Sequence, residues 1–193
     1  MVLVEFRIHG RGGQGAKSAA QFLAEAALLK GKYIQAFPEY GPERSGAPVA
    51  SFVRISDEKI ITHQPVVSPD YVAVIDESMF GLSLIYSGIT SKTTIVLNSS
   101  KTVSELKSAI PTISSFKGKV YTVPATEIAI KHIGSDKSNT AILTALVFYS
   151  KVVDFEDLKS IVYSYFTKKS PAIASKNIDV MEEVWKNLNE YHS

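Results

Sequence analysis

The chain of 193 residues contains no cysteine. Without thiols it cannot by itself form a disulfide framework, a cysteine nucleophile or a cysteine-held iron–sulfur cluster. It also lacks a long apolar run, because the longest stretch without a charged residue, Ser78 to Ser91, is shorter than the roughly 18 residues of a membrane-spanning helix. Glu5 and Arg7 interrupt the first apolar segment. We therefore expect no signal peptide, no membrane partner and a cytoplasmic protein.

The charge is nearly balanced, with 21 basic and 19 acidic residues and a formal net charge of +2. That balance, and the absence of a nucleic-acid-binding motif, predict no nucleic-acid partner. Hydrophobic residues make up 45% of the chain and charged residues 21%, which is typical of a globular protein. The length suits one domain spanning residues 1–193.

Arginine is scarce and unevenly placed. The four arginines, Arg7, Arg11, Arg44 and Arg54, all lie in the first 54 residues, and lysine supplies every later positive charge. Arginine offers a planar set of donors that suits phosphate and carboxylate. Since Arg11 and Arg44 stand in glycine-bearing segments, the first quarter of the chain is where we look for a site.

Short apolar segments alternate with segments of helical periodicity along the chain. Strands are expected at residues 2–9, 33–37, 49–55, 59–62, 71–75, 93–97 and 120–123. Helices are expected at residues 16–30, 79–86, 103–110 and 126–133, and from residue 139 onward, with Asp154 as an N-cap. This alternation predicts an α/β, Rossmann-like layered fold with a mostly parallel sheet and C-terminal helices. Residues 49–55 and 59–62 are predicted to form one β-hairpin insertion.

A glycine-rich segment follows the first predicted strand and precedes the first predicted helix. It matches the pattern G-x-G-x-x-G at Gly10, Gly12 and Gly15. In that pattern the first glycine makes a tight turn, the second lets a ligand approach the backbone, and the third lets helix and strand pack closely. The free amides of the following helix favour an anion, and Arg11 reinforces that preference. The candidate binding residues here are Gly10, Arg11, Gly12, Gly13, Gln14 and Gly15.

A dinucleotide site meets a difficulty in this sequence. Such a site places an acidic residue about 20 positions after the glycines, at the end of the second strand, to bind the ribose hydroxyls. The second predicted strand ends in Phe37 and Pro38, and Glu39 comes only after the proline. Two alternatives stay open: a free-standing Rossmann-type module that binds NAD(H), and glycines that serve packing alone.

A second glycine- and proline-rich segment spans residues 37–49. Its polar candidates are Glu43, Arg44, Ser45 and Gly46. A loop after the second strand emerges at the same sheet edge as the glycine segment, so we expect both loops to face one crevice. A simpler interpretation is a rigid surface loop in which Glu43 and Arg44 pair with each other.

Together, the two segments resemble the gamma subunit of the 2-oxoacid:ferredoxin oxidoreductases, in particular the pyruvate/2-ketoisovalerate branch. The matching residues are Ile8-His9-Gly10-Arg11-Gly12-Gly13-Gln14-Gly15-Ala16 and Gly41-Pro42-Glu43-Arg44-Ser45-Gly46-Ala47-Pro48-Val49. Gln64 to Val67, Pro69 to Val72 and Ser138 to Ala141 also look like segments of that family. The resemblance covers essentially the whole chain.

The resemblance implies a subunit of a pyruvate:ferredoxin oxidoreductase that is not active alone. It implies alpha, beta and delta subunits as partners, with ferredoxin as electron acceptor and coenzyme A as substrate. Thiamine diphosphate, Mg²⁺ and [4Fe-4S] clusters would lie on the partners, and this chain would bind no cofactor alone. It also implies a lid on the coenzyme A side of the thiamine site, and we expect the Gly12 to Gly15 amides, Arg11 and Arg44 to line it. Another 2-oxoacid as substrate, or a purely structural subunit, are the alternatives.

The remaining candidates point to no catalytic residue and no metal site in this chain. The four histidines are scattered without ligand spacing. His9 is expected either to contact a substrate or, more simply, to bond the backbone. Asp76 and Glu77 follow a predicted parallel strand, a position that favours function, but the simpler expectation is an N-cap for the following helix. Lys168-Lys169 is interpreted as a solvated helix end.

Overall fold

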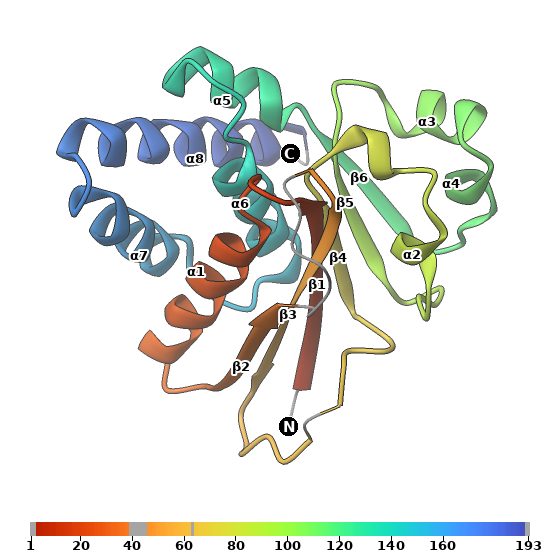
Figure 1. Cartoon of the computed structure of the whole chain (residues 1–193), viewed down its shortest axis with the longest axis horizontal. Helices are drawn as coiled ribbons and strands as arrows, with labels where there is room; N and C mark the ends of the chain where they lie inside the picture. Colours follow the sequence, from red (N-terminus) through yellow and green to blue (C-terminus); the bar gives the residue numbers. More distant parts are fainter. Residues whose placement is uncertain (1–2, 39–45, 63, 192–193) are drawn as a thin grey trace.

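The computed structural model describes residues 3–38, 46–62 and 64–191. Within these ranges a six-stranded sheet runs in the order β2-β3-β1-β4-β5-β6 (Figure 1). The strands are β1 (Leu3–Arg11), β2 (Tyr33–Pro38), β3 (Pro48–Ser56), β4 (Tyr71–Val74), β5 (Thr94–Asn98) and β6 (Lys119–Val123). Strand β4 is parallel to β1 and β5, β6 is parallel to β5, and β3 is antiparallel to both β1 and β2. The carboxyl ends of β1, β4 and β5 therefore meet at one edge of the sheet.

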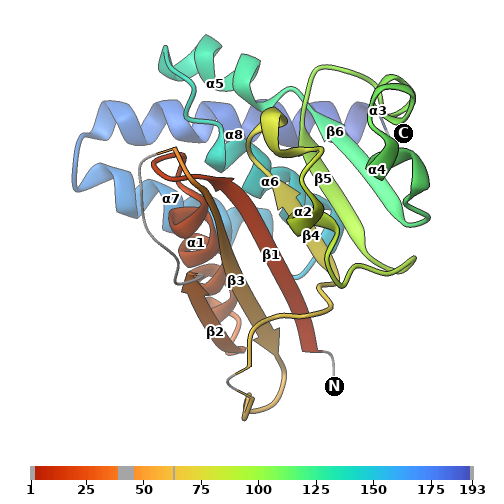
Figure 2. The same ribbon diagram turned by 45° about the vertical axis from the view of Figure 1, so that its right-hand side comes forward.

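Helices cover both faces of the sheet. They are α1 (Ala16–Leu29), η1 (Glu77–Met79), α2 (Ser83–Tyr86), α3 (Val103–Ala109), α4 (Pro111–Ser115), α5 (Ala125–Ile133), α6 (Asn139–Ser150), α7 (Phe155–Thr167) and α8 (Pro171–Tyr191). Figures 1 and 2 show α1, α6, α7 and α8 on one side of the sheet and α2, α3 and α4 on the other. No helix of the described part of the chain has both the length and the hydropathy of a membrane span.

Each face has its own apolar core because successive strand residues point to opposite sides. On β4, Ala73 belongs to the core under α1 and α6, whereas Val72 and Val74 belong to the core under α2, α3 and α4. Helix α6 is buried continuously from residue 139 to residue 147, so it is the central helix of its layer. The predicted α/β layered fold with a mostly parallel sheet and C-terminal helices is confirmed.

The predicted hairpin between residues 49–55 and 59–62 is wrong. Among the described residues, strand β3 pairs along one edge with β1 and along the other with β2, from Tyr33 opposite Ser56 to Pro38 opposite Ser51. Both edges of β3 are thus occupied, so residues 59–62 cannot pair with β3. The antiparallel hairpin of this fold is instead formed by β2 and β3.

Of two further helix predictions, the first is wrong and the second is confirmed to within one residue. The helix expected at residues 79–86 is divided into η1 and α2 by residues 80–82. The helix expected at 103–110 ends at Ala109, and α4 begins separately at Pro111, where a proline fits the first helical turn. Asp154 stands at the N-cap position of α7 but makes no side-chain cap bond, because its carboxylate pairs with Lys30.

Candidate functional site

The glycine segment forms a tight turn between β1 and α1. The amide of Gln14 donates to the carbonyl of Arg11 at 3.0 Å, and Gly13, at the third position of the turn, has φ 97°. Gly15 follows as the N-cap of α1 with φ 84°. Positive φ strains residues that carry a Cβ, so Gly13 and Gly15 are the positions at which the backbone requires glycine.

Gly10 and Gly15 have packing roles that differ from those predicted from the sequence. Gly10 does not make the turn: it lies in β1 opposite Val49, where an added Cβ would stand 3.4 Å from both Gln14 Oε1 and Ile75 Cδ1. Gly15 permits a close approach between two helices rather than between helix and strand. A Cβ on Gly15 would lie 2.7 Å from Asn139 Nδ2, at the start of α6.

The two loops meet at the carboxyl edge of the sheet, as far as the described residues extend. The amide of Gly12 donates to the carbonyl of Ala47 at 2.9 Å, and the amide of Gly46 donates to the carbonyl of Gly12 at 3.2 Å. The Gly12 amide is therefore used within the chain, contrary to the expectation that it faces a ligand. Glu43, Arg44 and Ser45 lie outside the described residues, and so does the predicted proximity of Arg44 to Arg11.

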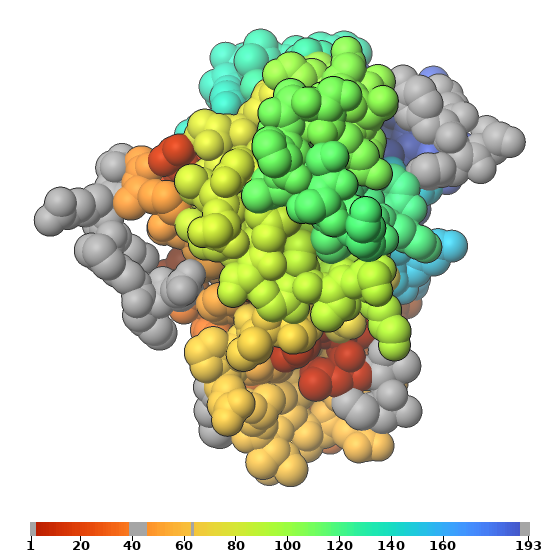
Figure 3. Space-filling view, turned by 90° about the vertical axis from the view of Figure 1, so that its right-hand side faces the viewer, coloured from red at the N-terminus to blue at the C-terminus, as the bar shows by residue number. Residues whose placement is uncertain are grey.

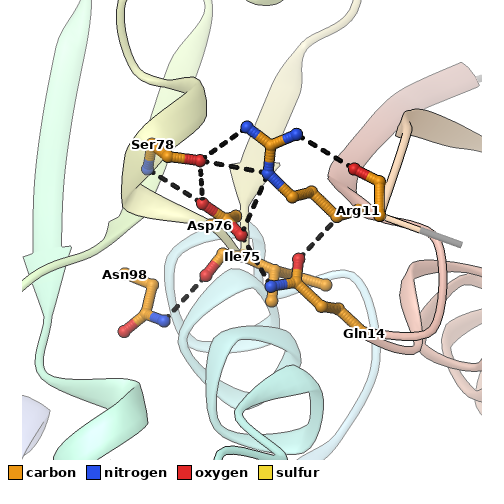
Figure 4. A network of polar contacts seen from close by, with 7 residues as sticks. Arg11, Gln14, Ile75, Asp76, Ser78 and Asn98 are labelled. Atoms are coloured by element: carbon orange, nitrogen blue, oxygen red, sulfur yellow. Dashed lines mark hydrogen bonds and ion pairs between the residues drawn. The ribbon is translucent and has the colours of Figure 1, made fainter.

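Arg11 joins the two loops to the end of β4 (Figure 4). Its Nη1 donates to the carbonyl of Gly46 at 3.0 Å, and its Nη2 donates to Ser78 Oγ at 2.7 Å. Its Nε lies 3.4 Å from Asp76 Oδ2. These contacts commit much of the guanidinium to protein groups, so Arg11 acts here mainly as a clamp between neighbouring loops.

Asp76 is the centre of this polar network. Its Oδ2 accepts a bond from Gln14 Nε2 at 2.7 Å, and its Oδ1 accepts the amide of Ser78 at 2.9 Å, which caps η1 as predicted. Gln14 also accepts the amide of Arg11 through Oε1 at 2.7 Å. Burial alone would raise the pKa of Asp76, but the bonds from Ser78 and Gln14 and the charge of Arg11 outweigh it and hold the pKa below its ordinary value. A charged carboxylate thus fixes the glycine turn.

Asn98 extends the network along the sheet edge, and sequence reasoning missed it. Its Nδ2 donates to the carbonyl of Ile75 at 2.7 Å, and its Oδ1 accepts the amide of Thr126 at 3.0 Å. Figure 4 shows Asn98 on the far side of Ile75 from Gln14. The signal available in the sequence was its position as the last residue of an apolar strand, where parallel sheets place polar ligand-binding and anchoring groups.

A cavity of about 480 Å³ opens beside the glycine turn, on the α1 and α6 side of the sheet. We call it the lysine pocket. Gly13 and Gly15 line it at one side, and Lys137, Lys169 and Lys176 line it elsewhere. Aromatic rings also contribute, and Lys169 Nζ lies 5.2 Å from the ring centre of Tyr165. No aspartate or glutamate is among its described lining residues.

The lysine pocket suits an anion for two reasons. Helix α1 begins beside the pocket with no acidic residue in its first turn and no side-chain cap, so its first amides and the positive end of its dipole are not used by a cap of its own. The three lysines add positive charge. Lys137, Lys169 and Lys176 are distant in sequence from the glycines, so no local pattern predicted the pocket, and Lys169 was expected only at a solvated helix end.

His9 lies on the other face of the sheet. It is 1% exposed, and neither ring nitrogen has a hydrogen-bond partner among the described residues, so the predicted backbone bond is not made. Burial, and to a smaller degree the charge of Arg7, lowers the pKa of His9 to about 3. The imidazole is therefore neutral. No group of three or more histidine, aspartate and glutamate side chains gathers into a metal-binding cluster in the described part of the chain.

Known proteins resemble this chain over most of its length. It is 43% identical over 167 residues to pyruvate synthase subunit PorC of Thermotoga maritima, which covers 86% of this chain and 84% of that protein. It is 36% identical over 189 residues to the common gamma subunit of the pyruvate/ketoisovalerate oxidoreductases of Thermococcus litoralis, covering 98% of this chain and 99% of that protein.

Fold and family comparisons agree with these relatives. The crystal structure of subunit PORC of Thermotoga maritima pyruvate oxidoreductase superposes with a TM-score of 0.83 at 37% identity, covering 96% of this chain and 97% of that one. The family model described as pyruvate ferredoxin/flavodoxin oxidoreductase matches residues 5–186. The chain therefore belongs to the pyruvate ferredoxin/flavodoxin oxidoreductase family, as a gamma subunit of a 2-oxoacid:ferredoxin oxidoreductase.

Proposed function

We propose that this gamma subunit serves a pyruvate:ferredoxin oxidoreductase and forms the coenzyme A side of its active site. The complete enzyme converts pyruvate, coenzyme A and two oxidised ferredoxins to acetyl-CoA, carbon dioxide and two reduced ferredoxins. Thiamine diphosphate with Mg²⁺ and the [4Fe-4S] clusters are assigned to the alpha, beta and delta partners, and this chain, as one domain of residues 1–193, binds none of them alone. The absence of cysteine agrees with that division.

The lysine pocket carries the proposal. Coenzyme A has a diphosphate and a 3′-phosphate, and the free amides at the start of α1 together with Lys137, Lys169 and Lys176 complement several negative charges. A volume of about 480 Å³ is within the usual range for sites that hold part of a cofactor-sized ligand. The partly buried rings of Tyr165 and Phe166, which line the pocket, offer an apolar surface for the adenine.

The contacts of Arg11 and Asp76 join the glycine turn to its neighbours, so that the turn serves as part of a lid. Because Arg11 bonds both Ser78 and the carbonyl of Gly46, the two loops are held to each other and to the end of β4. A lid built this way moves as one unit and excludes water from the thiamine adduct when it closes. Glu43, Arg44 and Ser45 belong to the same loop as Gly46 and remain proposed contacts for coenzyme A.

A triple replacement of Lys137, Lys169 and Lys176 by alanine tests the assignment in the reconstituted complex. Each exposed charge contact contributes about 0.2–1 kcal/mol, so losing three raises the KM for coenzyme A by about 3-fold to 150-fold while the KM for pyruvate stays unchanged. The matched control is the triple alanine replacement of three exposed lysines near the amino ends of β5 and β6, which removes the same charge: Lys92, Lys117 and Lys119.

Two outcomes of that experiment, and one separate measurement, discriminate the alternatives. Equal KM values for coenzyme A in both triple variants contradict the proposed site. Loss of assembly with normal coenzyme A kinetics in the surviving complexes supports a purely structural subunit. A free-standing NAD(H)-binding module has little support, because β2 carries no acidic residue for the ribose, and calorimetry of the isolated chain with NADH checks it directly.

The identity of the 2-oxoacid substrate is a separate part of the proposal. The Thermococcus litoralis relative is named as a subunit common to pyruvate and ketoisovalerate oxidoreductases, which favours a gamma subunit that leaves the choice of oxoacid to its partners. Under that interpretation 2-ketoisovalerate or another 2-oxoacid is a substrate when the partner subunits differ. Combining this chain with each set of partners and comparing kcat/KM for the two oxoacids decides the question.

A further inference from the structure

The segment between α5 and α6 has one side in the lysine pocket and the other side turned away from it. Residues 134–138 connect the two helices and belong to neither helix nor strand. Ser135 and Lys137 are among the residues that line the pocket, whereas Asp136 and Ser138, their sequence neighbours, are not. Alternate residues of this connecting segment therefore face different surroundings, and what holds Asp136 and Ser138 decides where Lys137 lies.

Two hydroxyl groups hold the carboxylate of Asp136. Thr126 Oγ1, in the first turn of α5, donates to Asp136 Oδ1 at 3.0 Å, and Ser138 Oγ donates to the same oxygen at 3.0 Å. Hydrogen bonds to an ionised acceptor are stronger than those between neutral groups. The amide of Lys137 itself donates to the carbonyl of Ser135 at 2.8 Å. The backbone on both sides of Lys137 is thus held in place.

Asn98 connects these hydroxyls to the sheet. Its Nδ2 lies 2.8 Å from Thr126 Oγ1 and 2.7 Å from the carbonyl of Ile75, so both of its N–H groups have an acceptor, and Ser138 Oγ is more distant at 3.4 Å. Asn98 is 7% exposed at the end of β5. The sheet thereby fixes the segment that carries Lys137 before any ligand binds.

We propose that Asp136 is a positioning residue for coenzyme A: together with Thr126 and Ser138 it holds the backbone at Lys137 so that the lysine ammonium meets a phosphate of the ligand. The inference rests on the coenzyme A site proposed above and deepens it. The lysine stem has several rotatable bonds, so a fixed backbone confines the volume that its ammonium reaches. Ordering a loose segment on binding lowers affinity, and a segment that is held beforehand avoids that loss. Asp136, Thr126 and Ser138 do not contact the ligand.

Replacing both hydroxyls removes the anchoring bonds without changing any charge. In Thr126→Val/Ser138→Ala, Asp136 Oδ1 loses the bonds from both hydroxyls, and Ser138 makes no cap bond that α6 would miss. In the reconstituted complex at low ionic strength, where screening is weakest, one exposed charge contact is worth about 3-fold to 5-fold in affinity. The KM for coenzyme A of this variant is therefore expected to rise by that factor, with kcat and the KM for pyruvate unchanged. Asn98 is left in place, because its loss removes a hydrogen bond of the buried Ile75 carbonyl.

A double-mutant cycle with Lys137 separates positioning from a general structural role. In the Lys137→Ala background, the same double replacement raises the KM for coenzyme A by less than about 1.5-fold, because the lysine that it would misplace is already absent. A general structural role predicts the same increase in both backgrounds, or a fall in kcat, and either result overturns the inference. Thr126→Ser keeps the hydroxyl, so it keeps the KM within about 1.5-fold of the wild-type value.

The matched control lies on the opposite face of the sheet. Thr112→Val/Ser115→Ala on α4 also removes one threonine and one serine hydroxyl, which donate to the carbonyls of Phe80 and Thr112. Figure 3 views the molecule from this side, where α2, α3 and α4 lie. Because these hydroxyls are remote from the lysine pocket, the control leaves the KM for coenzyme A within about 1.5-fold of the wild-type value.

Failure of this inference and failure of the proposed site give different results. If Lys137→Ala raises the KM for coenzyme A and Thr126→Val/Ser138→Ala does not, the lysine binds without help from Asp136 and the inference alone is overturned. If Lys137→Ala leaves the KM unchanged while the triple lysine variant raises it, the inference is again overturned and the site stands. If the triple lysine variant leaves the KM unchanged, the proposed site and the inference both fail.

Discussion

Gly15 offers the most exacting test of how the site is built. A Cβ at this position meets two separate penalties: the left-handed backbone with φ 84°, and contact with Asn139, whose Nδ2 would be 2.7 Å and whose Cγ would be 2.9 Å away. The backbone strain costs about 1–2 kcal/mol and the overpacking about 1–3 kcal/mol. Gly15→Ala therefore lowers the free energy of unfolding by about 2–5 kcal/mol. Urea denaturation of the isolated subunit at pH 7 measures this loss.

Gly13 provides the matched control. It too has positive φ, 97°, but an added Cβ meets nothing within 4 Å, so Gly13→Ala carries only the backbone strain of about 1–2 kcal/mol. Asn139 is 8% exposed and is held in the first turn of α6, which prevents it from moving aside freely. Combining Gly15→Ala with Asn139→Ala should recover about 1–3 kcal/mol in a double-mutant cycle. If both glycine variants lose the same stability and the cycle shows no coupling, the close approach of α1 and α6 is not what requires a glycine.

Two further predictions concern charged and titratable groups. Asp76→Asn removes the charge that binds Arg11 and replaces the acceptor of Gln14 Nε2 by an NH2 donor. It should cost about 1–3 kcal/mol of unfolding free energy at pH 7, with an unchanged denaturation midpoint as the contradicting result. Because the pKa of Asp76 is lowered in the folded state, its contribution is present above the unfolded pKa and is lost as the pH falls through the folded value, so this variant should lose less stability in acid than the wild type. The pKa of His9 is also lowered, to about 3, so the unfolded state binds the extra proton between that value and 6.5, and stability falls with decreasing pH across this window. Between pH 6.5 and 5.5 the loss from His9 is about 1 kcal/mol, and a wild-type and His9→Leu pair with parallel stability–pH curves would contradict it.

The layered architecture followed from local patterns. Apolar segments of four to nine residues, separated by helical periodicity, define β1, β4, β5 and β6 with small errors at their ends. The strand–glycine–helix pattern correctly predicted a turn between β1 and α1, because neighbouring residues decide it, but the turn spans Arg11 to Gln14 and Gly10 belongs to β1. The pairing of residues 49–55 was predicted wrongly because hairpin partners depend on which strand edges are free, and β1 and β2 occupy both edges of β3.

The sequence by itself determined the order of the elements, the glycine turn and the lack of thiol chemistry, because these depend on residue type and on contacts within a few positions. Only the tertiary structure decided which groups share a site. In the folded chain, the donors of Arg11 and Gly12 bond other groups of the protein. Lys137, Lys169 and Lys176 lie beside the start of α1, and His9 is buried without a partner among the described residues. The lysine pocket depends on how α7 and α8 pack beside the start of α1, and the bonds of Arg11 and Gly12 depend on where Gly46, Ala47 and Ser78 lie. Such long-range packing is set by the whole core, and no local pattern encodes it.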